Sequence, residues 1–295
     1  MSIRSRIVFV AGMTAGLCMA APDGADWPQW RGVERNGISA ETGWRTAAIA
    51  DGPKVLWRAD VGKGYSAVSI AGGRAYTMGN VDGRDIIHCL DAATGKEIWR
   101  HSYDCKAASY PGPRATPAVD GGNVYTFSRA GHVFCLNAAS GQVKWQRNVT
   151  AELNAKAPRW GFASSPVVID AALLLNAGPR GMALDKVSGR TLWDSGEGTG
   201  GYSALVPAKI AGIPSYLLFG QKGLLAVDPA NGKLRWSSEW VTSYDVNAAG
   251  PVALGDKVWI SSGYGRGCAL LDCSGATPRK VWENKALSAH FSSAV

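Results

Sequence analysis

This sequence repeats itself, and the clearest unit is Leu136-Asn137-Ala138-Ala139-Ser140-Gly141-Gln142-Val143-Lys144-Trp145. In it, an apolar residue and an Asn lead to a Gly, and a Trp follows four residues after the Gly. Three further stretches keep the pattern with Asp in place of Asn: Leu90-Asp91-Ala92-Ala93-Thr94-Gly95-Lys96-Glu97-Ile98-Trp99, Leu184-Asp185-Lys186-Val187-Ser188-Gly189-Arg190-Thr191-Leu192-Trp193 and Val227-Asp228-Pro229-Ala230-Asn231-Gly232-Lys233-Leu234-Arg235-Trp236. Asp and Asn side chains accept hydrogen bonds from turn amides, and Gly adopts a positive φ at little steric cost. Each stretch therefore predicts a tight turn followed by a strand that carries the Trp.

The spacing of the tryptophans indicates a regular repeat. Successive members lie 42, 46, 48, 43 and 46 residues apart, at Trp57, Trp99, Trp145, Trp193, Trp236 and Trp282. Trp57 closes an earlier, partial unit, and Trp282 closes a fifth unit that has a longer turn. A Trp has a large apolar face to bury, most simply between neighbouring sheets. We therefore assign a structural role in the packing of successive units to these six tryptophans and to the turn glycines Gly95, Gly141, Gly189 and Gly232.

Each unit also contains four short apolar segments separated by turns. In the second unit they cover residues 118–119, 124–127, 132–136 and 143–146. Alternating apolar residues between Gly or Asn turns predict β-hairpins. Four antiparallel strands in about 40–50 residues are typical of a β-propeller blade. We expect an all-β protein, a β-propeller of four-stranded antiparallel blades with about five blades and the start of a sixth.

The pattern A-x-D-x-x-T-G-x-x-x-W resembles the tryptophan-docking repeat of the pyrroloquinoline-quinone (PQQ) dehydrogenase-like propellers. That superfamily includes PQQ-dependent alcohol dehydrogenases and also BamB, the non-catalytic propeller of the outer-membrane β-barrel assembly machinery. The stretch Asp26-Trp27-Pro28-Gln29-Trp30-Arg31-Gly32 is similar to the opening of exported PQQ-like proteins, so the resemblance spans about residues 26–295. It implies that each repeat Trp packs on a neighbouring blade near its turn.

The chain divides into three regions. Residues 1–21 combine two early arginines with an apolar run too short to span a bilayer, which predicts a cleaved signal peptide; an uncleaved anchor is the alternative. Residues 22–56 precede the repeats, and residues 57–295 contain them. Members of the resembling superfamily usually have eight blades and sometimes seven, and residues 292–295 match the start of another unit. We therefore expect a fragment of a larger ring, with a short protein that closes by oligomerising as the alternative.

Charge and cysteine content disfavour several classes of function. The formal net charge is +8 and the basic residues are scattered, which favours a solvated surface over a nucleic-acid groove, so we expect no nucleic-acid partner. No C-x-x-C motif of a typical zinc site or c-type haem attachment is present. Cys89 and Cys135 occupy repeat positions that hold Ala183 and Ala226 in later copies, so we interpret them as buried small residues.

A catalytic quinoprotein needs specific groups, which the resemblance names. PQQ lies on the propeller axis between a Trp and a disulfide of adjacent cysteines, Ca²⁺ is held by carboxylate and amide oxygens, and an Asp acts as base. This sequence has no adjacent cysteines, and carboxylates do not stand out where the axial strands should begin. We therefore expect no cofactor and assign no catalytic, cofactor-binding or metal residue.

The best candidate surface is the mouth of the channel, in the loops before the innermost strands. Aromatic, basic and polar residues in these loops are Tyr65, Arg114, Arg159, Trp160, Tyr202, Asn247 and His290. Aromatic and Arg side chains on loops of a rigid scaffold are typical contact residues, although they could also serve only to cap the blade ends. We expect an exported (periplasmic or secreted), non-catalytic propeller without a transmembrane segment after cleavage, binding a protein or an extended peptide. The alternatives are a PQQ- and Ca²⁺-dependent alcohol or sugar dehydrogenase, or its degenerate relative, and carbohydrate binding in the channel.

Overall fold

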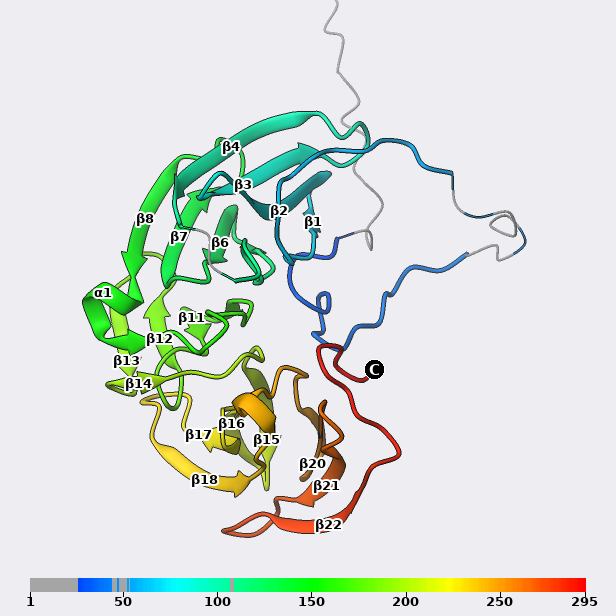
Figure 1. Cartoon of the computed structure of the whole chain (residues 1–295), viewed down its shortest axis with the longest axis vertical. Helices are drawn as coiled ribbons and strands as arrows, with labels where there is room; N and C mark the ends of the chain where they lie inside the picture. The colour runs from blue at the N-terminus through cyan, green and yellow to red at the C-terminus, as the bar shows by residue number, and fades with distance from the viewer. Residues whose placement is uncertain (1–25, 44–46, 48–51, 53, 107–108) are drawn as a thin grey trace, which may run out of the picture.

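Four-stranded antiparallel sheets make up nearly all the regular structure of this chain. The computed structural model describes residues 26–43, 47, 52, 54–106 and 109–295, so the predicted signal peptide, residues 1–21, lies outside the described residues. Five sheets follow one another along the chain, each with its strands in sequence order. They are arranged as an arc around a common centre (Figure 1). The predicted all-β propeller with five blades is confirmed.

Each blade consists of four strands in the order in which they occur in the sequence. The first blade is β1 (Ser69–Ala71), β2 (Arg74–Val81), β3 (Arg84–Asp91) and β4 (Glu97–Asp104). The second is β5 (Ala118–Asp120), β6 (Asn123–Phe127), β7 (His132–Asn137) and β8 (Val143–Asn148). The third is β10 (Val167–Ile169), β11 (Ala172–Leu175), β12 (Met182–Asp185) and β13 (Thr191–Asp194). The fourth is β15 (Val206–Ile210), β16 (Ile213–Phe219), β17 (Gly223–Val227) and β18 (Leu234–Glu239), and the fifth is β19 (Val252–Leu254), β20 (Lys257–Ser262), β21 (Gly267–Asp272) and β22 (Arg279–Asn284).

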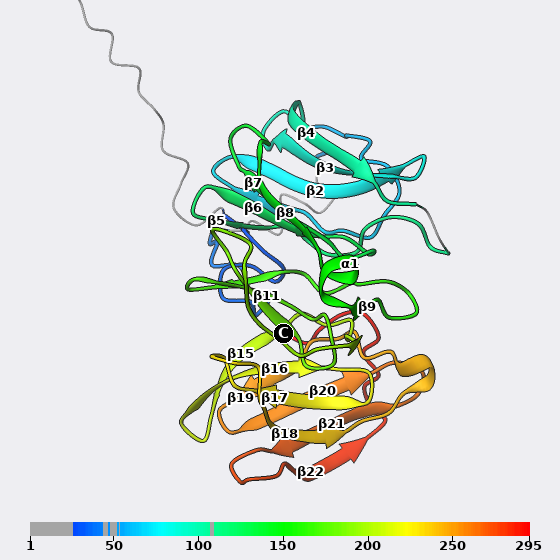
Figure 2. The same cartoon turned by 90° about the vertical axis from the view of Figure 1, so that its left-hand side faces the viewer.

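Short elements lie in the connections between blades. They are α1 (Val149–Leu153), the parallel pair β9 (Ala155–Lys156) and β14 (Gly198–Thr199), and the 3₁₀ turn η2 (Ser243–Asp245). Helix α1 begins at Asn148, whose side-chain oxygen accepts hydrogen bonds from two backbone amides of the first turn, and ends at Asn154 in the left-handed conformation. In Figure 2 the strands run between two faces of the arc, and α1 lies toward the right-hand one. Among the described residues, no helix combines the length and apolar character needed to cross a membrane.

Every blade has the same irregularity between its third and fourth strands. The strand register shifts by one residue next to the residue that pairs with the repeat Trp. That residue is Cys89, Cys135, Ala183, Ala226 and Leu270 in successive blades. Both cysteines are buried, and burial raises the pKa of the Cys89 thiol to about 11. The interpretation of these two cysteines as buried small residues is confirmed.

Four tryptophans pack on the turn glycine of the blade that follows them. A Cβ added to Gly141, which has φ +71°, would lie 2.6 Å from ring atoms of Trp99, so only Gly fits there. The indole N–H of Trp99 donates to the carbonyl of Ala138 at 3.0 Å, in the same turn. The same arrangement recurs in the pairs that we call the Trp–Gly seams: Trp57–Gly95, Trp99–Gly141, Trp145–Gly189 and Trp193–Gly232.

The hydrophobic core is divided among the junctions between blades. Four clusters of buried side chains each join two consecutive blades. Between the second and third blades, for example, Phe127 packs with Leu173 and Leu175, and all three are completely buried. Because removing apolar surface from water is the main favourable term in folding, each blade depends on its neighbours for stability.

The fifth blade departs from the repeat pattern. Trp236 is buried with Cys273 in the cluster between the fourth and fifth blades, but the turn glycine of the fifth blade, Gly275, meets no Trp. Trp282 is 39% exposed, and every residue of β22 is exposed. No described strand packs outside β22, so the packing of Trp282 on a neighbouring blade stays a prediction.

Candidate functional site

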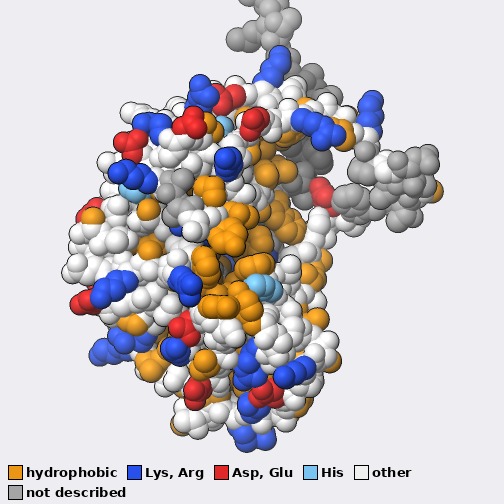
Figure 3. All heavy atoms as spheres, viewed as in Figure 1, with side chains coloured by type: hydrophobic (Ala, Val, Ile, Leu, Met, Phe, Trp, Pro, Cys, Tyr) orange, Lys and Arg blue, Asp and Glu red, His pale blue; other side chains and the backbone are white. Residues whose placement is uncertain are grey.

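One face of the arc collects the loops that connect the blades and the turns between second and third strands. Because neighbouring strands are antiparallel, the first strand of a blade begins on the same face on which the second strand ends. The connections between blades and the turns after the second strands therefore lie together on that face. Figure 3 shows hydrophobic side chains gathered in a band through the middle of the molecule on the face turned toward the viewer. Hydrophobic side chains gathered in this way on a surface mark candidate interaction sites.

Ring and guanidinium contacts connect residues of all five blades at this face. We call the set the mouth cluster, and its members are Tyr65, Tyr110, Arg114, Arg159, Trp160, Tyr202, Tyr244, Tyr264, His290 and Phe291. Five of these side chains are between 47% and 68% exposed: Tyr65, Tyr110, Tyr244, Tyr264 and Phe291. At least half of the cluster is thus exposed surface, and Tyr202 is its buried member.

The first half of the mouth cluster is built around two arginines. The Cζ of Arg114 lies 5.5 Å from the ring centroid of Tyr65, and its guanidinium donates to the carbonyl of Tyr110 at 2.8 Å. The ring of Tyr110 meets Trp160 edge to face, with centroids 5.6 Å apart. The Cζ of Arg159 lies 5.0 Å from the Trp160 ring and 5.4 Å from the Tyr244 ring. Arg159 therefore bridges the aromatic rings of two different connections by cation–π contacts.

The second half of the cluster is aromatic throughout. The rings of Tyr244 and Tyr264 lie 5.5 Å apart, and those of Tyr264 and His290 lie 4.6 Å apart. His290 stacks on Phe291 with centroids separated by 3.8 Å. Burial lowers the pKa of His290, which favours the neutral imidazole and an apolar contact surface at neutral pH.

Three tyrosines of the cluster adopt a left-handed backbone conformation. Their φ values are 56° for Tyr110, 63° for Tyr244 and 58° for Tyr264. This conformation costs a bulky residue about 1–2 kcal/mol, and Gly or Asn would adopt it more readily. Since the three side chains are exposed, burial of apolar surface does not explain the strain. Strained residues of this kind gather at sites where a side chain serves binding or catalysis.

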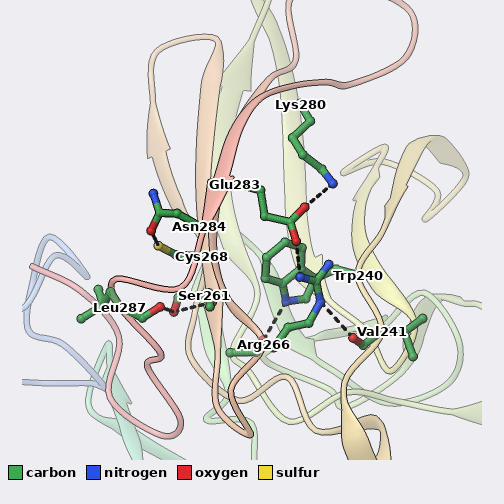
Figure 4. Close-up of polar contacts among 11 residues, drawn as sticks. Trp240, Val241, Ser261, Arg266, Cys268, Lys280, Glu283, Asn284 and Leu287 are labelled. Carbon is green, nitrogen blue, oxygen red and sulfur yellow. Dashed lines mark hydrogen bonds and ion pairs between the residues drawn. The ribbon is translucent and has the colours of Figure 1, made fainter.

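A network of polar contacts around the buried Trp240 connects the loops that carry Tyr244 and Tyr264 (Figure 4). Arg266, in the same turn as Tyr264, places its Cζ 3.5 Å from the ring of buried Trp240. The Arg266 guanidinium donates to the carbonyl of Val241 at 3.1 Å and pairs with Glu283, which also binds Lys280. Hydrogen bonds from Lys280 and Arg266 lower the pKa of Glu283. The network ties the connection from the fourth blade to the turn of the fifth, so the two tyrosines are held in place before any ligand binds.

Two of the mouth residues predicted from the sequence are buried beneath the surface and support the loops above them. Asn247 is 1% exposed, and its amide donates to three carbonyls while Ser262 donates to its side-chain oxygen at 2.6 Å. Asn247 is therefore a structural residue, which corrects its prediction as a contact residue. Tyr202 is 6% exposed and lies below Trp160, whose backbone N–H donates to the Tyr202 hydroxyl oxygen at 3.4 Å.

The structure brings the other predicted mouth residues together and adds four that the sequence analysis missed. Tyr65, Arg114, Arg159, Trp160 and His290 all belong to the cluster. The missed members are Tyr110, Tyr244, Tyr264 and Phe291. One pattern could have revealed two of them, since Tyr110 and Tyr244 each follow a Ser in the connection between blades.

A second concave region lies near the axis, where residues 26–43 meet the innermost strands. It is a cavity of about 270 Å³ lined by the starts of the third, fourth and fifth blades and by residues of the N-terminal segment and the C-terminal tail. Arg31 donates to the carbonyl of Ala294 at 2.6 Å, and Arg35 donates to that of Val168 at 2.8 Å. Glu34 is the one carboxylate in the lining, and the lining contains no Cys. Ca²⁺ prefers six to eight oxygen ligands including carboxylates, so the described lining does not fit a Ca²⁺-bound PQQ.

Comparison with known proteins identifies the family. A family model described as outer membrane protein assembly factor BamB matches residues 45–113 and 83–294. The chain belongs to this family. An outer membrane protein assembly factor BamB from Yersinia pestis is 29% identical over 153 residues, which are 48% of this chain and 36% of that protein.

Solved structures share the fold at low sequence identity. BamB from Moraxella catarrhalis is 17% identical with a TM-score of 0.56, covering 78% of this chain and 64% of that one. The quinohemoprotein alcohol dehydrogenase from Comamonas testosteroni is 15% identical with a TM-score of 0.66, covering 91% of this chain and 50% of that one. The chain thus spans less than two thirds of the length of each of these relatives. The predicted resemblance to PQQ-like, BamB-like propellers is confirmed.

Proposed function

We propose that this chain is an exported, non-catalytic propeller that binds a protein or an extended peptide through its mouth cluster. The observation that carries the proposal is the continuous line of exposed and half-buried aromatic and arginine side chains across five blades. Membership of a family described as an outer-membrane assembly factor supports it. Tyr, Trp and Arg are the residues that most often dominate protein–protein binding energy.

The shape of the cluster suits an elongated ligand. Its contacts run from Tyr65, before the first blade, to Phe291, after the fifth. An extended peptide presents side chains alternately to opposite sides, so one side can contact successive rings along such a line. Because the supporting network holds the loops in place, little ordering entropy is lost from the protein on binding.

The dehydrogenase alternative has less support from the described residues. Among them, no three His, Cys, Asp or Glu side chains form a group that could hold a metal ion. The axial cavity is lined by two arginines and one carboxylate, a poor match to the ligands that Ca²⁺ prefers. The likeness to quinohemoprotein alcohol dehydrogenases, at 15% identity, concerns the fold alone.

Peptide selection tests the proposed function. A phage library of random twelve-residue peptides is panned against the protein and, in parallel, against the variant Trp160→Ala/Tyr244→Gly. We expect families of peptides that bind the protein and lose most of their affinity for the variant. No enrichment, or equal binding to both proteins, would contradict the proposal.

Two further assays test the alternatives on the same preparation. After reconstitution with PQQ and Ca²⁺, we expect no dye reduction with alcohols or sugars, and robust turnover would overturn the non-catalytic role. Titration with oligosaccharides is expected to leave tryptophan fluorescence unchanged, and saturable quenching lost in the Trp160→Ala variant would favour carbohydrate binding instead.

Export has its own test, since residues 1–21 carry the predicted signal peptide. We expect the chain produced in a bacterial host to begin at Ala21 or Pro22 when the periplasmic fraction is analysed by mass spectrometry. An intact N-terminus in the cytoplasm would contradict export.

A further inference from the structure

Three guanidinium groups at the channel mouth have no carboxylate partner among the described residues. Arg114 donates only to backbone carbonyls, and Arg159 makes only ring contacts. The third, Arg129, follows β6 and has a buried Nη1 without any hydrogen-bond partner. An unpaired guanidinium nitrogen away from water is costly, so its presence here needs an explanation.

Arg129 lies directly beneath the loop that carries Arg159 and Trp160. A Cβ built on Gly161 would come 3.0 Å from Cβ and 3.2 Å from Nε of Arg129, and the backbone N–H of Phe162 donates to the Arg129 carbonyl at 2.9 Å. The close approach of the Gly161 backbone, at φ +83°, leaves no room for a side chain between them. Arg129 is therefore a fixed part of the floor under the mouth cluster.

Arg114 and Arg129 are close enough to repel one another. The pKa of Arg114 is lowered first by burial and then by the positive charge of Arg129. Smaller effects of Tyr65, Tyr202 and buried Asp85 raise that pKa, but neither arginine forms an ion pair with a described carboxylate. Two partly buried cations without an ion-pair partner are unfavourable in the free protein. A ligand carboxylate placed between them would remove this repulsion and would also supply a hydrogen-bond acceptor.

Several acidic residues near the mouth are either ion-paired with other side chains or buried. Asp245, beside Tyr244, pairs with Lys222 at 2.7 Å. Asp85 is completely buried and accepts hydrogen bonds from Asn80 and Tyr103, so it does not face the mouth surface. Three further acids at this end of the blades are ion-paired as well: Asp104 with Arg84, Glu152 with Arg147 and Glu197 with Lys156. None of these ion pairs includes Arg114, Arg129 or Arg159, so the three arginines have no ion-pair partner among the described residues.

We propose that the partner of the mouth cluster is an acidic, extended polypeptide segment whose carboxylates bind Arg114, Arg129 and Arg159. Its apolar side chains pack on the exposed rings of Tyr244 and Tyr264 and on the half-buried ring of Trp160. The proposal rests on the proposed function, which it deepens by naming the chemistry of the partner. Charge complementarity of this kind raises both specificity and association rate.

A polypeptide fits this surface better than a nucleic acid does. A nucleic-acid site needs a continuous basic groove that follows the phosphate backbone, together with aromatic faces open to stacking bases. Here the proposed contacts involve three separate guanidinium groups, those of Arg114, Arg129 and Arg159. The rings of Tyr110, Tyr244 and Tyr264 meet their neighbours edge to face. Several faces are therefore covered by neighbouring rings, while their edges and hydroxyls remain available to side chains of a peptide.

The test uses two matched libraries of twelve-residue peptides panned on the whole chain. In one, fixed alternate positions are Asp or Glu; in the other, the same positions are Asn or Gln, and the remaining positions are random in both. We expect strong enrichment only from the acidic library. For the best synthetic acidic peptide, we expect its Asn/Gln counterpart to bind about tenfold more weakly or worse, and the acidic peptide to weaken as salt is raised.

Arginine variants locate the effect at the mouth. The Arg159 side chain is exposed and makes no hydrogen bond to the protein, so the Arg159→Gln variant should fold normally. We expect its affinity for the acidic peptide to fall about threefold to tenfold and its affinity for the Asn/Gln counterpart to stay unchanged. Arg190→Gln is the matched control, since Arg190 is also exposed but lies in the turn between β12 and β13 at the opposite end of the blade. It should leave both affinities unchanged.

The outcomes separate this inference from the proposed function. If both libraries yield peptides of equal affinity that depend on Trp160, peptide binding stands and the acidic partner is overturned. If neither library yields a mouth-dependent peptide, both proposals fail. Binding of single-stranded oligonucleotides that exceeds binding of the acidic peptide, and is lost in Arg159→Gln, would assign the surface to nucleic acid instead.

Discussion

The aromatic residues of the Trp–Gly seams and those of the mouth cluster belong to two different environments. Trp99 and Trp193 are 9% and 8% exposed, and each rests on a glycine with a left-handed backbone. In the mouth cluster it is the aromatic residue that has the left-handed backbone, as in Tyr244 and Tyr264, and the ring is about half exposed. In the seams the backbone is adapted to bury the ring, whereas at the mouth strain is tolerated to expose it.

This difference separates the residues that stabilise the fold from those that bind. Seam residues recur at the first four blades because each of these junctions needs the same packing. Mouth residues occur once each, in connections of different length, because a ligand that crosses the mouth meets each blade at a different place. Substitutions in the seams should therefore lower stability, while those at the mouth should lower affinity.

The largest effect is expected for removing a buried seam ring. Trp193→Ala leaves a cavity above Gly232 and removes the hydrogen bond from the indole N–H to the Pro229 carbonyl at 2.9 Å. We expect the free energy of unfolding to fall by about 3–5 kcal/mol, measured by urea denaturation. Trp282→Ala, at the same repeat position but with a ring 39% exposed, should cost less than about 1 kcal/mol. Equal losses for the two variants would show that the next blade does not determine the role of the Trp.

The next effect tests the other side of a seam. Gly141→Ala places a Cβ 2.6 Å from the Trp99 ring in a left-handed conformation, so we expect a loss of about 3 kcal/mol in urea denaturation. Gly212→Ala is the control, because its φ is similar at +77° but nothing lies within 4 Å of the added Cβ. Its cost should be confined to the backbone, about 1–2 kcal/mol. A control variant that loses as much as Gly141→Ala would contradict the packing argument.

At the mouth, substitutions should change peptide affinity more than stability. Tyr244→Gly relieves the left-handed strain but removes the ring contact with Tyr264 and the cation–π contact with exposed Arg159. We expect the free energy of unfolding to change by less than about 1 kcal/mol, because relief of about 1–2 kcal/mol offsets the lost contacts and the added chain entropy. Peptide affinity, measured by calorimetry, should fall about tenfold. A variant that unfolds readily but binds normally would place Tyr244 among the structural residues.

The smallest effect concerns the polar part of a seam turn. Hydrogen bonds from Ser188, first through its hydroxyl and then through its backbone N–H, lower the pKa of Asp185. A carboxyl group with a lowered pKa in the folded state stabilises the protein above its ordinary pKa, and that contribution is lost as the pH falls through the folded value. We expect stability to decline below about pH 4, and Asp185→Asn to reduce the decline by less than about 1 kcal/mol. An unchanged pH profile in this exposed turn would contradict the assignment.

Sequence alone predicted the seams well because they are periodic. The turn Asp, Gly and Trp recur at fixed offsets, and local turn chemistry fixes the φ of Gly95 and Gly141 whatever surrounds them. Prediction from the sequence failed or stayed untested at positions whose surroundings come from another blade or another loop. Trp282 matches the repeat but has no described blade beside it, and Asn247 lies in a predicted axial loop but turns into a buried network.

The mouth cluster could be predicted only in part for the same reason. Trp160 and Arg159 were found because they lie in the loop before an innermost strand. Tyr264 lies in a turn inside the fifth blade, and its partner Tyr244 lies in the connection before that blade. No local pattern links these two positions, and only the packing of the fifth blade on the fourth, through Arg266 and Trp240, brings them together.

Hydrogen–deuterium exchange with and without the selected acidic peptide tests most directly that the mouth cluster is the binding surface. Bound peptide should slow exchange in residues 109–114, 159–162, 242–246 and 263–266, which carry the cluster, and should leave the exposed outer strand β22 unchanged. Protection confined to β22, or to the axial cavity around residues 31–36, would contradict this account and move the binding surface away from the mouth.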